Sequence, residues 1–180
     1  RTPLNAILGF AQLLQSDNDA PLTETQQDSL KLIIHSGEHL LKLINDVLEL
    51  AKIETGTVDV SIEPVNVNIA IKHCLPMLKN LAARYRVSIH TDDIPDQLVL
   101  ADLTKLKQVL INLVSNAIKY NRPDGEVIIS VEVIDSTKRL RITIRDTGIG
   151  IPQDKQAYLF TAFDRLGQEN SGIEGTGVGL

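Results

Sequence analysis

The chain has 180 residues, of which 43% are hydrophobic and 23% charged, and its 18 Lys and Arg against 23 Asp and Glu give a net charge of −5. This composition excludes a disordered chain, and the acidic balance argues against nucleic acid as a partner, because phosphate backbones require a clustered basic surface. No apolar run approaches the roughly 20 residues that cross a bilayer, and Cys74 is the only cysteine. We therefore expect no membrane contact from this segment, even if the parent protein is membrane-anchored, and a reducing, cytoplasmic location.

Two amphipathic helices are predicted in the first third of the chain. Apolar residues recur at helical spacing over residues 4–14, and again three and four residues apart over residues 30–51. A polar turn with Pro21 separates them, and Thr23 can cap the second helix while Gln26 reaches back to it. Helices with one-sided apolar seams cannot bury them alone. We therefore expect a helical hairpin that pairs with a second copy into a four-helix bundle.

The pattern changes after residue 56, where we place a boundary between a hairpin of residues 1–56 and a second domain of residues 57–180. Helices are predicted over residues 68–83 and from Asp102, as the cap, to about Tyr120. Strands are predicted over residues 57–62, 87–90, 98–100, 127–134 and 140–145, the last two antiparallel. This order contains no repeated strand–helix–strand unit, so we predict an α+β sandwich with its helices on one face of the sheet.

The helix that follows Asp102 carries polar side chains on one face. Asn112, Asn116 and Lys119 are four and three residues apart, opposite the apolar residues that would bury the helix. An amide oxygen is a suitable ligand for Mg²⁺, and an ammonium group can meet a phosphate. These residues are candidates for metal and phosphate binding, although a solvated polar face would give the same pattern.

Seven of the eleven glycines lie between Gly148 and Gly179. Asp146 opens an Asp-x-Gly-x-Gly motif at the end of a predicted strand, where a carboxylate can accept a hydrogen bond from an adenine amino group, although Asp-x-Gly is also a common turn. The chain closes on Gly-x-Gly-x-Gly-Leu, whose N–H groups can surround phosphate oxygens or belong to a flexible tail. Between these motifs, Phe160 and Phe163 are interpreted as packing anchors rather than base-stacking residues, and Arg165 could reach a terminal phosphate.

The order of these motifs resembles the N, G1, F and G2 boxes of the ATP-binding domain of histidine kinases. The beginning of the chain agrees independently, because Arg1-Thr2-Pro3-Leu4 matches the segment that follows the phosphorylated histidine in the family pattern His-Glu-Leu/Met-Arg-Thr-Pro-Leu. The resemblance covers the whole chain and implies the core of a bacterial two-component sensor histidine kinase. Residues 1–56 would be its dimerisation and phosphotransfer hairpin, and residues 57–180 its catalytic domain, with the fold shared by histidine kinase, gyrase and Hsp90 ATPases.

The resemblance also implies roles for individual residues. Catalytic roles fall to Thr2, which supports phosphatase action in the family, and to Asn116, Lys119 and Arg165. Asn116 would ligate Mg²⁺ with help from Asn112, and Asp146 would read the adenine amino group. The remaining nucleotide contacts implied are Lys119, Tyr120, Gly148, Gly150, Ile151 and Phe160, followed by the lid residues Gly175, Thr176, Gly177, Gly179 and Leu180.

The activity that the resemblance implies is Mg-ATP-dependent phosphorylation of a histidine in a homodimer, followed by transfer to an aspartate of a response-regulator receiver domain. The acceptor histidine would lie three residues before Arg1, and the family continues past Leu180, so we expect a chain trimmed at both ends that cannot phosphorylate itself. Two alternatives stay open at this point. One is a non-catalytic, nucleotide-binding dimeric scaffold, and the other is a gyrase-like or Hsp90-like ATPase, which would carry Glu where this chain has Asn112.

Overall fold

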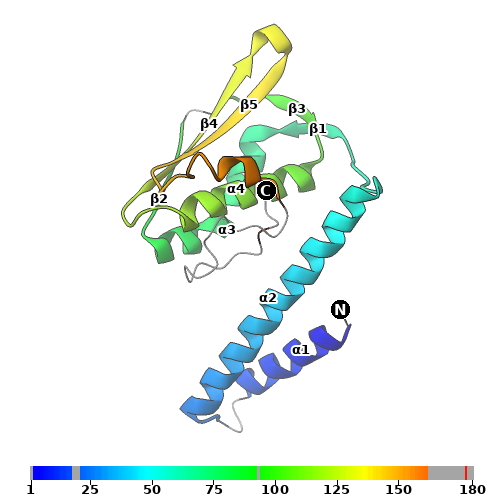
Figure 1. The fold of residues 1–180 in the computed structure, drawn as a ribbon, viewed down its shortest axis with the longest axis vertical. Coiled ribbons are helices and arrows are strands. Elements are labelled where there is room, and N and C mark those ends of the chain that lie inside the picture. The colour runs from blue at the N-terminus through cyan, green and yellow to red at the C-terminus, as the bar shows by residue number, and fades with distance from the viewer. Residues whose placement is uncertain (1, 18–20, 93, 162–176, 178–180) are drawn as a thin grey trace. The chain divides into compact units, whose positions relative to one another are not determined.

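The computed structural model describes residues 2–17, 21–92, 94–161 and 177. The chain divides into two compact units, Arg1–Val58 and Asp59–Leu180. The first unit contains helices α1 (Thr2–Ser16) and α2 (Glu24–Glu54), and the second contains the described strands together with helices α3 (Val67–Tyr85) and α4 (Leu103–Lys119) (Figure 1). None of the described helices combines the length and the apolar character that a membrane-spanning segment requires.

Helix α2 begins with the cap that the sequence predicts. The N–H of Gln26 donates to Thr23 Oγ1 at 3.3 Å, and the N–H of Thr23 donates to Gln26 Oε1 at 3.0 Å. This reciprocal capping box satisfies N–H groups that have no partner inside the helix. The helix ends at Glu54, and Gly56 takes a φ of +66°, a left-handed conformation that glycine adopts without steric cost.

The two helices of the hairpin approach closely at one point. Leu8, Ala11 and Leu30 are the buried apolar residues in the described part of this unit. A Cβ added at Gly37 would lie 2.6 Å from Leu8 Cδ2, so the contact between α1 and α2 is built around a residue without a side chain. Among the half-buried positions of α2, Ile34, Gly37, Leu41 and Ile44 follow the same three-and-four spacing.

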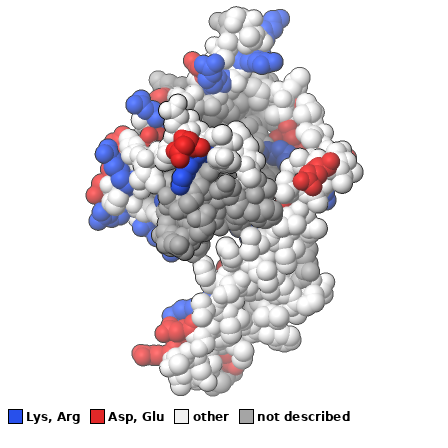
Figure 2. All heavy atoms as spheres, in the orientation of Figure 1, with Lys and Arg blue, Asp and Glu red and all other residues white. Residues whose placement is uncertain are grey.

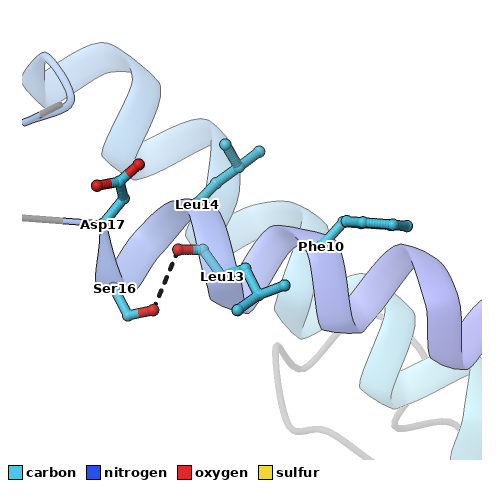
Figure 3. A pocket seen from close by; sticks show the side chains of 5 residues that line it. All are labelled: Phe10, Leu13, Leu14, Ser16 and Asp17. Carbon is cyan, nitrogen blue, oxygen red and sulfur yellow. Dashed lines mark hydrogen bonds between the residues drawn. The ribbon is translucent and has the colours of Figure 1, made fainter. Parts of the chain in front are cut away.

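A second apolar row on α2 stays exposed. Ile33, Leu40 and Val47, spaced seven residues apart, are each 46% to 48% exposed. On α1, an open depression of about 650 Å³ is lined by Phe10, Leu13, Leu14, Ser16 and Asp17 (Figure 3). On the side shown in Figure 2, the surface of the hairpin is largely uncharged over much of its length. The apolar residues of α2, predicted as one stripe, therefore form two rows. Helix α1 covers the row that contains Gly37, and the row Ile33, Leu40 and Val47 is exposed.

The second unit contains two small sheets and two long helices. Its elements, in chain order, are β1 (Glu63–Asn66), α3 (Val67–Tyr85), β2 (Ser88–Thr91), β3 (Leu98–Ala101), α4 (Leu103–Lys119), β4 (Glu126–Ile134), a 3-10 turn (Asp135–Thr137), β5 (Arg139–Asp146) and a 3-10 turn (Gln156–Tyr158). Strands β1 and β3 form an antiparallel ribbon. In the other sheet the order is β2-β4-β5, with β2 parallel and β5 antiparallel to β4.

Both helices of this unit cover the same face of the three-stranded sheet. The alternate residues Val127, Ile129 and Val131 of β4 are buried, and they share one core with α3 and α4. The largest side chains that are less than 2% exposed are Ile71, Ile118, Ile129, Val67, Val114 and Val127. This arrangement confirms the predicted α+β sandwich, and its aliphatic core follows from the period-2 and period-3.6 patterns of the three elements.

One predicted strand is wrong. Residues 57–62 alternate in polarity but have no strand assignment, and β1 begins only at Glu63 and includes Pro64. The reason is register, because β3 pairs with residues 63–66, with Pro64 opposite Leu100. An alternating pattern makes a strand only where a partner offers its hydrogen-bonding groups, and a proline is tolerated where its missing N–H faces away from the ladder.

Candidate functional site at the end of helix α4

The cap of α4 is anchored at both carboxylate oxygens. Asp102 Oδ1 accepts from the N–H of Lys105 at 3.0 Å, which confirms the predicted cap, and Oδ2 accepts from the N–H of Ser61 at 3.0 Å. The hydrogen bond from Lys105, and after it the one from Ser61, hold the pKa of the Asp102 carboxyl below its usual value. One side chain thus fixes both the start of α4 and the segment that leads into β1.

The polar face of α4 lies opposite its buried residues, as predicted. Leu110, Val114, Ala117 and Ile118 are buried, whereas Asn112, Asn116, Lys119 and Tyr120 are half-buried. The side-chain amides of Asn112 and Asn116 have no hydrogen-bond partner among the described residues. Amide oxygens in this state can serve a hard cation such as Mg²⁺. These residues therefore fit the metal that the sequence implies.

Asp146 ends β5 and begins the glycine-rich turn. Its Oδ1 accepts from the N–H of Gly148 at 2.8 Å, and the carboxylate is exposed. This hydrogen bond fixes the orientation of the carboxylate within the turn. The second oxygen has no partner among the described residues, so it can accept a hydrogen bond from an exocyclic amino group of a ligand.

The turn after Asp146 lies against the C-terminal end of α4. A Cβ added at Gly148 would lie 2.4 Å from the carbonyl oxygen of Tyr120 and 2.8 Å from Asp146 Oδ1, so only glycine fits at this position. The same Tyr120 oxygen accepts from the N–H of Ile149 at 3.2 Å. These contacts bring the Asp-x-Gly motif directly beside the helix end that carries Asn116 and Lys119.

The remaining described residues of the predicted site have different surroundings. Gly150 takes a φ of +69°, and an added Cβ there would meet nothing within 4 Å, so backbone conformation rather than space favours glycine. Ile149 and Ile151 on either side are 67% and 42% exposed, so both present apolar side chains at the surface of the turn. Phe160 is 82% exposed, so its interpretation as a packing anchor is wrong, because the short 3-10 turn before it buries no residue that could hold it.

The structure places only some of the predicted site residues. Phe163, Arg165, Gly175, Thr176, Gly179 and Leu180 lie outside the described residues. Gly177 lies in a bend and takes a φ of +72°, which again suits glycine. Thr2 belongs to the other unit, where it is the exposed first residue of α1.

Three residues that join the parts of the site are not predicted from the sequence. Asn121, Gly125 and Thr147 link the end of α4 to the start of β4 and the end of β5. The signal was present in Asn121-Arg122-Pro123-Asp124-Gly125, which is rich in turn formers, and in the hydroxyl inside the Asp-Thr-Gly motif. Such patterns predict a turn, but they do not show which side chains from distant segments meet there.

Fold and site together define an α+β domain of the ATPase type that follows a helical hairpin, and comparisons with known proteins agree. Residues 1–56 match the His Kinase A (phospho-acceptor) domain, and residues 101–180 match the histidine kinase-, DNA gyrase B-, and HSP90-like ATPase family. Two curated relatives are the cell-division control histidine kinases PdhS of Brucella suis (strain ATCC 23445 / NCTC 10510) and Brucella abortus (strain S19). They are 35% and 36% identical to this chain over 193 residues, which cover 100% of the chain and 18% of each relative.

Solved structures give the same result. The crystal structure of full-length ShkA in complex with AMPPNP matches 99% of this chain and 36% of its own, with a TM-score of 0.79 and 31% identity. Histidine kinase ThkA in complex with the response regulator protein TrrA matches 93% of this chain and 48% of its own, with a TM-score of 0.62 and 25% identity. The chain belongs to the histidine kinase family, which removes the gyrase-like and Hsp90-like alternatives.

Proposed function

We propose that this chain is a sensor kinase core that binds Mg-ATP in its second unit. In the proposed reaction the bond between the γ-phosphorus of ATP and the β–γ bridging oxygen breaks and ADP leaves, while a nitrogen–phosphorus bond forms on a histidine imidazole, which loses its proton. That nitrogen–phosphorus bond then breaks as the phosphoryl group passes to a carboxylate oxygen of an aspartate in a response-regulator receiver domain. Support comes from the family, from ShkA crystallised with AMPPNP and from ThkA in complex with the response regulator TrrA. The carrying observation is the contact of Gly148 and Ile149 with Tyr120, which sets Asp146 beside the polar end of α4.

In this proposal, different residues of the site bind different parts of the nucleotide. Asp146 accepts a hydrogen bond from the adenine amino group, and Ile149 and Ile151 offer apolar surface to the ring. Lys119 meets the phosphates as a point charge at the end of α4. Asn116 and Asn112 would hold Mg²⁺, which supplies neutralisation of the phosphate charge. Positioning and charge neutralisation account for most of the catalysis in phosphoryl transfer of this kind.

Replacing Asp146 tests the base-reading half of the site. Asp146→Asn exchanges an acceptor for a group that also presents a donor, and the loss of one charge-assisted hydrogen bond should weaken nucleotide binding by about 1.5 to 3 kcal/mol. Titration calorimetry of the chain with Mg-AMPPNP measures this loss. Asp92→Asn, at an exposed position after β2, is the matched control and should bind like the parent.

The metal half of the site is tested in the same assay. Asn116→Ala should reduce the gain in affinity that Mg²⁺ gives while leaving magnesium-free binding nearly unchanged. If both Asp146→Asn and Asn116→Ala bind Mg-AMPPNP with the affinity of the parent, the site assignment is wrong.

We also propose that Thr2 supports removal of phosphate from the regulator. Its hydroxyl is exposed on the first turn of α1, where it can orient a water molecule toward a phosphoaspartate of a docked partner. In the whole kinase, Thr2→Ala should slow regulator dephosphorylation while autophosphorylation persists, and Thr25→Ala on α2 serves as the control. Equal loss of both activities in Thr2→Ala would indicate a structural role instead.

A further inference from the structure

Three segments of the second unit meet in one group of hydrogen bonds at the end of α4. The side chain of Asn121 donates from Nδ2 to the carbonyl oxygens of Ala117, at 3.1 Å, and Glu126, at 3.0 Å. Its Oδ1 accepts from Thr147 Oγ1 at 3.1 Å and from the N–H of Arg122 at 3.0 Å. Every hydrogen-bonding position of this amide is therefore used. The side chain connects the last turn of α4 to the start of β4 and to Thr147, which follows β5.

The hydroxyl of Thr147 completes the group. Thr147 Oγ1 accepts from the N–H of Glu126 at 2.9 Å while it donates to Asn121, and the N–H of Thr147 donates to the carbonyl oxygen of Glu126 at 3.2 Å. Gly125 leaves the space for this arrangement, because a Cβ there would lie 2.2 Å from Asn121 Oδ1 and 2.8 Å from Thr147 Oγ1. A Cβ at these distances would force the hydrogen-bonded pair or the turn to shift, so glycine at this position suits the arrangement.

The pair stands between the two halves of the proposed nucleotide site. Asn121 follows Lys119 and Tyr120 directly, and Thr147 lies between Asp146 and Gly148. Both side chains are half-buried, and their hydrogen bonds go to protein groups rather than to open space. Meanwhile α4 is already held to the sheet by the fully buried Val114, Ile118 and Val127. The pair therefore sets the local geometry between the end of α4 and the turn after Asp146, in a unit whose fold is stabilised by its apolar core.

We propose that Asn121 and Thr147 are positioning residues that fix the distance between the adenine-reading Asp146 and the phosphate-binding end of α4. The inference rests on the proposed function, because it matters only for a ligand that contacts both ends at once. Such a ligand is bound tightly only if the two ends are held at the separation that it spans, since otherwise binding must order them first. Neither residue touches the reacting groups; both act through the Tyr120–Gly148 contact.

Thr147→Val and Thr147→Ser form a matched pair for the test. Valine keeps the shape but removes the partner of the Glu126 N–H and one of the two donors to Asn121 Oδ1, which retains the N–H of Arg122. Serine keeps the hydroxyl. Because each lost hydrogen bond corresponds to about a fivefold change in an equilibrium constant, and Thr147→Val removes two, we expect it to weaken Mg-AMPPNP binding by about fivefold to twenty-fivefold. Thr147→Ser should stay within about twofold of the parent on the same scale.

Base selectivity separates positioning from stability. The ratio of the Kd values for Mg-GMPPNP and Mg-AMPPNP depends on where Asp146 is held, and it is unaffected by a general loss of stability in protein that remains folded. Thr147→Val should lower this ratio, and Thr147→Ser should restore it. Hydrogen exchange of the ligand-free chain should show faster exchange at residues 147–149 in Thr147→Val alone, with the amides of the α3 core unchanged.

Three results would overturn the proposal. They are an unchanged selectivity ratio together with unchanged exchange at residues 147–149, equal effects of valine and serine, and loss of the cooperative unfolding transition in Thr147→Val, which would make the pair a requirement for folding. If the parent chain itself binds no Mg-AMPPNP, the proposed function fails. The exchange measurement needs no ligand, and in that case it alone decides whether the pair positions residues 147–149.

Discussion

The two units of this chain differ in how completely they bury their apolar residues. In the second unit, side chains from α3, α4 and β4 close around one another, and six of the large ones are less than 2% exposed. In the hairpin, Leu8, Ala11 and Leu30 are buried, but Phe10, Leu13, Leu32 and Leu40 remain 48% to 69% exposed. Both regions have strong apolar periodicity, so periodicity alone does not tell whether a chain completes its own core.

The difference follows from the number of layers. A helix covered by a sheet and a second helix can bury most of a broad apolar stripe, whereas two helices side by side cover only the strip between them. The exposed row Ile33, Leu40 and Val47 therefore needs a further layer. We propose that a second copy of the hairpin supplies it and completes a four-helix bundle, and that the second unit is stable without such help.

Leu40→Glu should have the largest effect, because it places a carboxylate in the proposed contact between copies. Losing a buried leucine removes about 1.5 to 3 kcal/mol per protomer, and an unpaired buried charge adds to the cost. Light scattering at micromolar concentration should report a dimer for the parent and a monomer for the variant. Lys42→Glu, at an exposed position on another face of α2, should remain dimeric. A monomeric parent with intact helices would contradict the bundle.

Replacing either of two glycines of the hairpin with alanine should change stability by a smaller amount, and the two changes should differ in direction or size. Gly9 lies within α1, where an added Cβ meets nothing within 4 Å, so Gly9→Ala should stabilise the chain by about 0.5 to 1 kcal/mol through helix propensity. At Gly37 the same substitution places its Cβ 2.6 Å from Leu8 Cδ2, and the shift that Leu8 must make should cancel or exceed that gain. Thermal unfolding followed by circular dichroism compares the two, and equal stabilisation would show that α1 and α2 do not approach closely at Gly37.

The smallest expected effect is on the pH dependence of the stability of the second unit. Because the N–H groups of Lys105 and Ser61 lower the pKa of Asp102 in the folded chain, its contribution to stability is complete above the unfolded value, near 3.8. That contribution is lost as the pH falls through the lower, folded value. Asp102→Asn should therefore reduce stability at neutral pH and show a shallower loss on acidification than the parent. Chemical unfolding at a series of pH values tests this, and parallel pH profiles for the two chains would disprove the role of Asp102.

Local pattern predicts two helix caps and the polar face of α4. The N-caps Thr23 and Asp102 were found because a capping side chain acts on N–H groups only three residues away. The polar face of α4 was found because helical spacing sorts neighbouring residues onto faces. Asn121 and Thr147 were missed because their partners lie up to 26 residues apart, and no local pattern indicates that a turn amide and a strand-end hydroxyl will meet.

The sequence by itself determined the element types, the aliphatic core of the second unit and the motif order that marks a histidine kinase. These features arise from periodicity, capping and glycine placement, which act over a few residues. Tertiary structure alone decided that residues 63–66 rather than 57–62 form β1, that the seam of α2 divides into a covered and an exposed row, and that Gly148 lies against Tyr120. Each of these depends on which distant backbone supplies a hydrogen-bonding partner or a surface, and that choice is made only when the whole unit packs.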